Sequence, residues 1–270
     1  MPSPASLGLI AGNGRFPLLF AKEAKRKNFK VFAVGIRGDT SCWLRFFVDK
    51  LSWVSPGELQ KMIEFFKGYG IQKILMAGQV NRNNLFDRKG NLDGEFQRLF
   101  SDLKDRKADT IFNAVAEKLK KEGLELIDST FLLKDYLAPK GTLTRRGPKE
   151  KELEDIAFGR EIAKAMGNLD VGQTVVIKEK AIVAIEAMEG TDKTILRGGR
   201  IAKKGAVVVK TAKPKQDERF DIPVIGPRTI DTMIKAKCCC LAIEAGKTLI
   251  IDKSLCVKMA DENKICMLAS

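Results

Sequence analysis

The sequence predicts an α/β protein with two domains: an N-terminal Rossmann-like domain built on a parallel sheet, and a separate C-terminal α+β or α/β domain. In the first half, short apolar runs alternate with segments of helical periodicity, which is the pattern of a parallel sheet covered by helices. Residues 137–148 then lack periodicity and contain two prolines and two glycines. We therefore expect the N-terminal domain at 1–136, a linker at 137–148 and the second domain at 149–270.

The N-terminal domain should begin with a strand, a glycine turn and a helix. Leu7–Ala11 is apolar, Pro17 precedes a helical pattern over 18–27, and between them lie the turn residues Gly12, Asn13 and Gly14. Proline suits the first turn of a helix, whose amides and dipole can bind a phosphate. The turn lacks the lysine of a P-loop and has Pro17 in the place of a third glycine. It therefore favours phosphate binding over a purely structural turn, without indicating NAD.

Strands and helices continue to alternate along the rest of this half. We expect strands at 30–34, 73–77 and 124–127, and helices around 59–66 and 111–119. Asp39 follows the second strand, where a dinucleotide fold meets a ribose, and Gly78 and Arg82 follow the third. Ligands of parallel sheets bind beyond the carboxyl ends of the strands, so Gly78 and Arg82 are candidate substrate contacts. An aromatic cluster, with Trp43, Leu44, Phe46 and Phe47, favours core packing over a surface for acyl chains.

The second half is richer in β-branched residues. We expect a helix at 149–166, strands at 174–177, 181–187, 206–209, 239–243 and 248–251, a helix through 230–234 and a last helix from 254. The loop at 213–227 contains three prolines, which forbid a helix. Its acids, Asp217, Glu218 and Asp221, lie among the bases Lys213, Lys215 and Arg219. This mixture suits either a metal ion with a polyanion or a solvated loop.

Five carboxylates follow apolar strands of this half: Glu186, Glu189, Asp192, Asp221 and Glu244. Charged residues at strand ends are often only solvated, but carboxylates are also the natural ligands of Mg²⁺ or Mn²⁺ that bridges a pyrophosphate. The candidate metal ligands are Glu186, Glu189, Asp192 and Asp221. The cations expected to offset charge on a phosphoryl group are Lys213, Arg219 and Arg197.

The composition excludes several kinds of site. The 270 residues include no histidine, which excludes imidazole bases, Ser-His triads and histidine-bound zinc. The six cysteines form no Cys-x-x-Cys pair, so we expect reduced, packed thiols. The net charge of +14 favours anionic partners, but the interleaved acids and the few aromatics disfavour nucleic acid. The sequence shows neither a bilayer-spanning apolar run nor a signal peptide, so we expect a cytoplasmic protein.

Four segments occur in order along the chain, Gly8–Pro17, Ala184–Asp192, Lys213–Pro227 and Leu241–Gly246. Together they closely resemble the LpxI-type UDP-2,3-diacylglucosamine diphosphatases, cytoplasmic enzymes of lipid A biosynthesis, over nearly the whole chain. The resemblance implies metal-dependent hydrolysis of UDP-2,3-diacylglucosamine to UMP and 2,3-diacylglucosamine 1-phosphate (lipid X), with Mg²⁺ or Mn²⁺. In that family an Arg-x-Asp-x-Pro motif carries the essential aspartate. The motif implies Asp221 as the catalytic residue, with Arg219 beside it.

The resemblance also implies how the substrate is held. The glycine turn resembles the nucleotide end of the site, while the C-terminal domain is the catalytic one and holds the metal and the acylated sugar. Lys213, Gln216 and Thr191 complete the candidate substrate contacts. The implied partners are UDP-diacylglucosamine and lipid X, with peripheral contact at the inner membrane, which the positive charge fits. A homodimer is left open.

The sequence departs from the family pattern at two places: Arg82 is followed by Asn83 instead of proline, and Ala108 precedes Asp109 where two aspartates are usual. Two other classes of function stay open. A non-catalytic nucleotide-binding regulator predicts binding without turnover. An NAD-dependent oxidoreductase predicts nicotinamide binding, which the missing third glycine disfavours.

Overall fold

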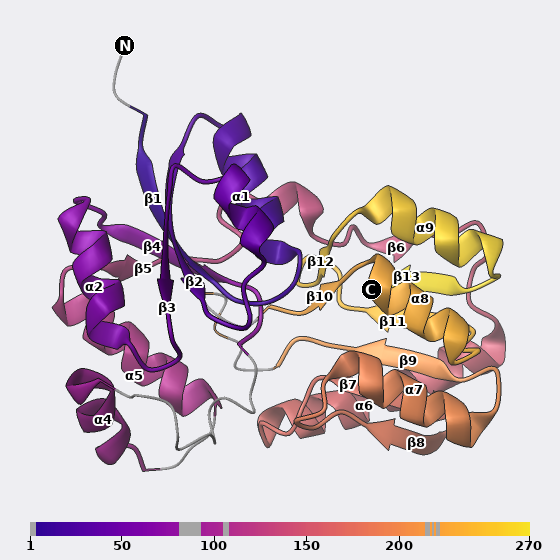
Figure 1. Ribbon diagram of the computed structural model, residues 1–270. Helices are drawn as coiled ribbons and strands as arrows, with labels where there is room; N and C mark the ends of the chain where they lie inside the picture. Colours follow the sequence, from indigo (N-terminus) through magenta and orange to yellow (C-terminus); the bar gives the residue numbers. More distant parts are fainter. Residues whose placement is uncertain (1–3, 81–92, 105–107, 214–216, 218, 220–221) are drawn as a thin grey trace. The chain divides into compact units, whose positions relative to one another are not determined.

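The computed structural model describes residues 4–80, 93–104, 108–213, 217, 219 and 222–270. The chain divides into two compact units, with the boundary between Lys134 and Asp135 (Figure 1). Each unit has its own sheet and its own apolar core, as expected of two domains. No helix in the described ranges is both long enough and apolar enough to cross a bilayer.

The N-terminal unit alternates strands and helices. Its strands are β1 (Ser6–Ala11), β2 (Lys30–Ile36), β3 (Lys50–Val54), β4 (Lys73–Ala77) and β5 (Glu125–Leu126). Its helices are α1 (Phe16–Arg26), α2 (Leu59–Gly68), α4 (Gly94–Ser101) and α5 (Ala108–Lys121), with the 3₁₀ helix η1 (Cys42–Phe46). The strands form one parallel sheet in the order β3-β2-β1-β4-β5. The predicted Rossmann-like parallel sheet is confirmed.

The direction of the chain across this sheet changes at β1, because β2 and β3 lie on one side of it and β4 and β5 on the other. Helix α1 covers one face of the sheet, and α2 and α5 cover the other (Figure 1). Phe20 of α1 is fully buried, while Phe66 of α2 and Leu119 of α5 share one core cluster. The carboxyl ends of β1 and β4 therefore form a topological switch point, where open α/β sheets bind their ligands.

The C-terminal unit contains a six-stranded mixed sheet in the order β6-β13-β11-β9-β7-β8. Its strands are β6 (Gly141–Thr142), β7 (Thr174–Lys178), β8 (Ala181–Ile185), β9 (Val207–Lys210), β11 (Cys240–Ile243) and β13 (Cys266–Ala269). Strands β9, β11 and β13 are parallel, and β6, β7 and β8 run antiparallel to their neighbours. A separate parallel pair joins β10 (Val224–Ile225) to β12 (Leu249–Ile250).

Helices cover both faces of the six-stranded sheet. They are α6 (Glu150–Asn168), α7 (Thr191–Ala202), α8 (Pro227–Lys235) and α9 (Lys253–Glu262), and the 3₁₀ helix η2 (Lys134–Tyr136) stands at the boundary of the unit. Ile156 of α6 packs with Val207 in one core cluster, whereas Ile195 of α7 and Met233 of α8 pack with Val208 in another. Because Val207 and Val208 point to opposite faces of β9, this domain is a three-layer α/β/α unit.

The predicted linker, residues 137–148, is part of the C-terminal unit and not a free connection. The amide of Ala138 donates to the carbonyl of Thr248 at 2.8 Å, and β6 pairs with β13. Arg146 forms an ion pair with Glu152 of α6 at 2.8 Å. The prolines and glycines that suggested a linker are equally typical of a short edge strand.

All six cysteines are free thiols, as predicted; Cys42 is exposed, Cys239 is half-buried and the other four are buried. Cys240 of β11 and Cys266 of β13 are paired neighbours in the sheet, and both are buried. Burial raises the pKa of the Cys238 and Cys239 thiols to about 12. Both thiols are therefore neutral at physiological pH and unreactive as nucleophiles.

Candidate functional site

Predicted and unpredicted polar residues gather at one edge of the C-terminal sheet. Strand β8 ends next to Glu186, β9 ends at Lys210 and β11 ends next to Glu244. Because β7 is antiparallel to β8 and β9, it begins at this edge, with Thr174 paired to Lys210. The carboxyl end of the parallel strands is where α/β proteins place functional groups.

Three side chains at this edge form a continuous hydrogen-bonded chain. The Lys210 ammonium donates to the Thr191 hydroxyl at 2.8 Å, and that hydroxyl donates to Glu186 Oε1 at 3.1 Å. The Thr174 hydroxyl lies 3.4 Å from that of Thr191. Thr191 is the first residue of α7, where Gly190 turns the chain with a φ of 83°. The positive end of the α7 dipole therefore lies beside the Glu186 carboxylate.

Both charged members of this chain are buried. Lys210 is 4% exposed and Glu186 is 7% exposed. Burying two charges is costly unless each is paired and hydrogen-bonded. Yet Glu186 Oε2 is buried without a hydrogen-bond partner among the described residues. An orphaned carboxylate oxygen beside a buried ammonium indicates a site for a ligand more than a structural ion pair.

The other two described metal candidates are neutralised by arginines. Glu189 Oε1 lies 2.5 Å from Arg197, and Asp192 Oδ2 lies 2.7 Å from Arg228. Burial opposes ionisation of Glu189, but hydrogen bonds from Arg197 and from backbone amides outweigh it and lower the pKa. Both carboxylates therefore already have an arginine partner.

One carboxylate among the described residues fits a ligand of the expected divalent metal. No three His, Cys, Asp or Glu side chains converge in the described ranges. Mg²⁺, however, is usually held by one or two carboxylates together with substrate phosphates and waters. Glu186, with its orphaned Oε2, fits the role of one such carboxylate. Asp221 lies outside the described residues.

The loop that follows β9 is fixed at both ends. At its start, Lys213 contacts Asp170 at 2.6 Å, and the amide of Ala212 donates to Glu244 Oε2 at 2.9 Å. Burial raises the pKa of Glu244, but hydrogen bonds from Lys247 and from the Ala212 amide outweigh this effect and lower the pKa. At its end, Leu249 of β12 donates to the carbonyl of Pro223 at 2.8 Å. Among the predicted loop residues, Arg219 is half-buried, and Gln216 lies outside the described residues.

The glycine turns of the N-terminal unit pack against each other. The amide of Gly12 donates to Ala77 at 2.8 Å, and that of Asn13 donates to Gln79 at 2.6 Å. A Cβ at Gly12 would lie 2.6 Å from the Gln79 carbonyl oxygen, and one at Gly78 would collide with the Asn13 carbonyl. Gly12 and Gly78 are therefore needed for the contact between the loops.

The amides of Gly12 and Asn13 therefore already donate hydrogen bonds to protein carbonyl groups. Contrary to the expectation for these two residues, their amides are not open donors for a phosphate. Gly14 is exposed, has a φ of 94° and has open space around it at the start of α1. Phosphate binding at this turn stays a prediction, centred on Gly14 and the N-terminus of α1. Arg82, the remaining candidate of this unit, lies outside the described residues.

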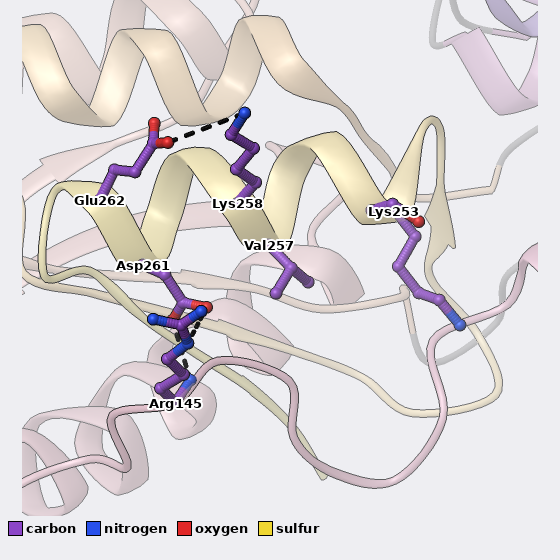
Figure 2. Close-up of a pocket in the computed structure, with 7 residues that line it drawn as sticks. Arg145, Lys253, Val257, Lys258, Asp261 and Glu262 are labelled. Carbon is purple, nitrogen blue, oxygen red and sulfur yellow. Dashed lines mark hydrogen bonds and ion pairs between the residues drawn. The ribbon is translucent and has the colours of Figure 1, made fainter.

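A surface hollow of about 660 Å³ lies elsewhere in the C-terminal unit, along α9. Figure 2 shows four of its charged side chains in two pairs, Asp261 with Arg145 and Glu262 with Lys258, while Lys253 lies apart from them. The hollow contains none of the predicted site residues. We assign it no function.

Sequence reasoning missed Lys210 and Thr174. One predicted strand ends at Val209, directly before Lys210, and another begins at Thr174. Lys210 and Thr174 therefore lie at strand ends, where polar side chains are usually solvated. A lysine directly after three valines in a buried parallel strand is the signal that could have identified Lys210.

Comparisons with known proteins cover both domains. The family model described as the LpxI N-terminal domain matches residues 6–136, and that of the LpxI C-terminal domain matches residues 139–268. UDP-2,3-diacylglucosamine pyrophosphatase LpxI of Caulobacter vibrioides is 28% identical over 278 residues, which cover 95% of this chain and 94% of that protein.

Likeness to solved structures is weak. N5-carboxyaminoimidazole ribonucleotide synthetase in its ADP complex has a TM-score of 0.30 and 15% identity, covering 66% of this chain and 33% of that chain. Pyruvate carboxylase of Rhizobium etli has a TM-score of 0.30 and 14% identity, covering 71% of this chain and 15% of that chain. Neither likeness bears on the function of this chain.

Proposed function

The chain belongs to the LpxI family, and on this basis we propose that it hydrolyses the pyrophosphate bond of UDP-2,3-diacylglucosamine. The products are UMP and 2,3-diacylglucosamine 1-phosphate. Support comes from the Caulobacter relative, whose name gives this substrate and which aligns with both domains. Because the identity to this relative is 28%, the proposal also relies on the chemistry that the site residues could perform.

The observation that carries the proposal is the buried chain from Lys210 through Thr191 to Glu186. In the reaction, water adds to one phosphorus, the anhydride P–O bond breaks, and its electron pair leaves on a phosphate oxygen. Negative charge on the phosphoryl oxygens grows as this happens. A fixed ammonium in a water-poor site stabilises such charge far more than an exposed one does.

Lys210 is placed for this role. An ammonium has three donors, and among the described residues one of them is engaged, by Thr191. Thr191 holds the ammonium in place and connects it to Glu186. The family motif supports Asp221 as the group that orients or deprotonates the attacking water, with Arg219 as a second cation.

A requirement for Mg²⁺ or Mn²⁺ is a further part of the proposal. Glu186 Oε2 and Asp221 are the carboxylate oxygens we assign to it, and phosphate oxygens complete the ligands. Such an ion would polarise the phosphoryl group and make a bound water more acidic.

The experiment uses the purified full chain with UDP-2,3-diacylglucosamine in detergent micelles and Mg²⁺ or Mn²⁺, and measures UMP release. We expect turnover by the wild type and none by a folded Asp221→Asn variant. Binding of the nucleotide without UMP release would indicate the regulator, and nicotinamide binding would indicate the oxidoreductase. Either result would overturn the proposal.

A further inference from the structure

The connection between β2 and β3 carries two aromatic side chains to the surface. A parallel crossover usually contains an α-helix, but here the described connection contains only η1, packed beside α1. Its central residue, Leu44, is fully buried. Trp43 and Phe46 are 65% and 56% exposed, so core packing, the expectation for this cluster, holds for Leu44 and fails for these two rings.

The two rings form one apolar surface. Residues three apart eclipse each other in a 3₁₀ helix, which places Trp43 and Phe46 on the same side of η1. Their ring centroids are 5.7 Å apart, at an interplanar angle of 43°. Single exposed apolar residues are common on proteins, but adjacent aromatic rings on an anchored element mark an interaction site.

The backbone on either side of η1 is held to the sheet. Thr40 donates to the carbonyl of Ala11 of β1 at 2.5 Å and accepts from the amide of Ile36 of β2 at 2.8 Å. After η1, Asp49 accepts from the amide of Val31 at 2.8 Å. With Leu44 buried between these attachments, the rings are presented on a fixed element.

Two cations lie over aromatic rings of this segment. The Arg45 guanidinium lies 4.6 Å from the centroid of the Phe46 ring, and the Lys22 ammonium lies 4.9 Å from that of Phe47. Lys22 and Lys25 are exposed on α1, whereas Glu23 of the same helix is buried and paired with Arg26. Arg45 and Lys22 therefore place positive charge beside the aromatic rings of this segment.

We propose that the Trp43–Phe46 patch, with Arg45 and Lys22, docks the protein on an anionic phospholipid bilayer. Aromatic rings favour the interface between headgroups and acyl chains, and nearby cations are attracted to anionic headgroups. The inference rests on the proposed function, because a diacylated substrate resides in a membrane. A protein partner would need complementary polar contacts, and the described patch offers mainly rings and cations.

The test measures sedimentation of the full chain with vesicles made of equal parts phosphatidylcholine and phosphatidylglycerol, and with vesicles of phosphatidylcholine alone. We expect preferential binding to the anionic vesicles. The Trp43→Ser/Phe46→Ser double variant should bind about tenfold more weakly. The control, Leu169→Ser/Ile201→Ser, removes two side chains that are 71% and 62% exposed in the other unit and should bind like the wild type.

A second readout uses the two tryptophans of the chain, Trp43 and Trp53. In Trp53→Phe, the remaining Trp43 should shift its emission to the blue on anionic vesicles and be quenched by brominated lipid. In Trp43→Phe, Trp53 should show neither effect. If Trp53→Phe does not fold, subtracting the emission spectrum of Trp43→Phe from that of the wild type gives the emission of Trp43.

Turnover in detergent micelles separates this proposal from the proposed function. Wild-type UMP release without vesicle binding, or a double variant that binds vesicles like the wild type, would overturn the docking surface alone. Equal binding to both kinds of vesicle would also overturn it, since the cations would then have no role. Vesicle binding with no turnover in micelles would instead overturn the proposed hydrolysis.

Discussion

The ammonium of Lys210 donates a 2.8 Å hydrogen bond to the hydroxyl of Thr191, although the two residues belong to different elements of the C-terminal unit. Lys210 ends the buried strand β9, and Thr191 begins α7, which packs against β7 and β8 of the same sheet. The bond holds a positive charge at the carboxyl edge of the sheet, where it is shielded from water. Several properties of the site depend on this pair.

Replacing Lys210 with Met should abolish most of the activity and keep the fold. Methionine has a similar length without the charge, and losing a fixed donor to the transition state typically costs about a hundredfold in kcat. Stability should fall, because removing the ammonium leaves the buried Glu186 carboxylate without the cation that Thr191 connects to it. UMP release and thermal unfolding measure the two effects. Lys235→Met, at an exposed ion pair with Asp231, should behave like the wild type in both. Full activity of Lys210→Met would remove Lys210 from the site.

The hydroxyl of Thr191 should matter more than its methyl group. Thr191→Ser keeps the bonds to Lys210 and Glu186, whereas Thr191→Val keeps the shape and loses them. We expect near wild-type kcat for the serine variant and roughly a ten- to hundredfold loss for valine, since a hydrogen bond to a charged group contributes roughly 1.5–3 kcal/mol.

Thr232→Val is the matched control for this prediction, because it removes a buried hydroxyl of α8 that bonds only to backbone in the described structure. It should lower the melting temperature without changing kcat. If Thr191→Val and Thr232→Val had the same kcat, the role of Thr191 would be structural.

The glycines inside α7 should be needed for packing. A Cβ at Gly199 would lie 2.5 Å from the carbonyl oxygen of Ala236, at the end of α8. Gly199→Ala should therefore lower the free energy of unfolding by about 1–3 kcal/mol. Gly68, in the last turn of α2, has no heavy atom within 4 Å of such a Cβ, so Gly68→Ala should raise stability by about 0.5–1 kcal/mol. Urea unfolding measures the free energy of unfolding of both variants. Equal changes in the two variants would contradict the packing argument.

The adjacent glycines Gly198 and Gly199 also explain why α7 could not be predicted from the sequence. Gly198-Gly199 interrupts the helical pattern, and the reason for it lies in distant residues, Val176 of β7 and Ala236. By contrast, β1, β2 and β4 were predicted close to their observed bounds, because each is a short apolar run next to a turn or a helix. Local periodicity encodes these elements, whereas close packing between elements is not visible in it.

Some residues of the candidate site could likewise be predicted from the sequence, and others could not. Glu186 was predicted because a carboxylate follows an apolar strand there, and Thr191 was a candidate substrate contact implied by the family resemblance. Their partner Lys210 was missed, since it lies 19 residues beyond Thr191 and reaches it only through the pairing of β9 with β7. Glu189 and Asp192 match the pattern equally well, but the fold places an arginine beside each. A sequence pattern names residue types, and the fold decides which of them are already neutralised.

The ion pair between Arg146 and Glu152 should make stability depend on pH in the acid range. Burial raises the pKa of Glu152, but hydrogen bonds from Arg146 and from the Lys149 amide outweigh it and hold the pKa below the ordinary value of 4.5. A lowered pKa in the folded state means that the stabilisation is present above the unfolded value and is lost as the pH falls through the folded one. Glu152→Gln should therefore be less stable than the wild type at neutral pH and lose less stability below about pH 4.5.

Urea unfolding across this pH range measures that difference. Glu154→Gln is the control, because Glu154 lies on the same helix and forms an exposed ion pair with Lys180. Its profile should follow the wild type, since exposed pairs contribute little. Parallel profiles for wild type and Glu152→Gln would show that the pair does not set the acid response.

We expect Glu186 Oε2, which has no hydrogen-bond partner among the described residues, to be a ligand of the divalent ion that activity requires. EDTA should abolish turnover by the wild type, and Mg²⁺ or Mn²⁺ should restore it. Glu186→Gln keeps the Oε1 acceptor for Thr191 but puts an NH₂ group in place of Oε2, so the fold should persist while the metal concentration for half-maximal activity rises by about tenfold or more. Glu189→Gln and Asp192→Asn change carboxylates that arginines already neutralise, and their metal dependence should match the wild type. Titrating each variant with Mg²⁺ separates these cases, because full wild-type activity after chelation, or equal shifts in all three variants, would show that Glu186 holds no metal.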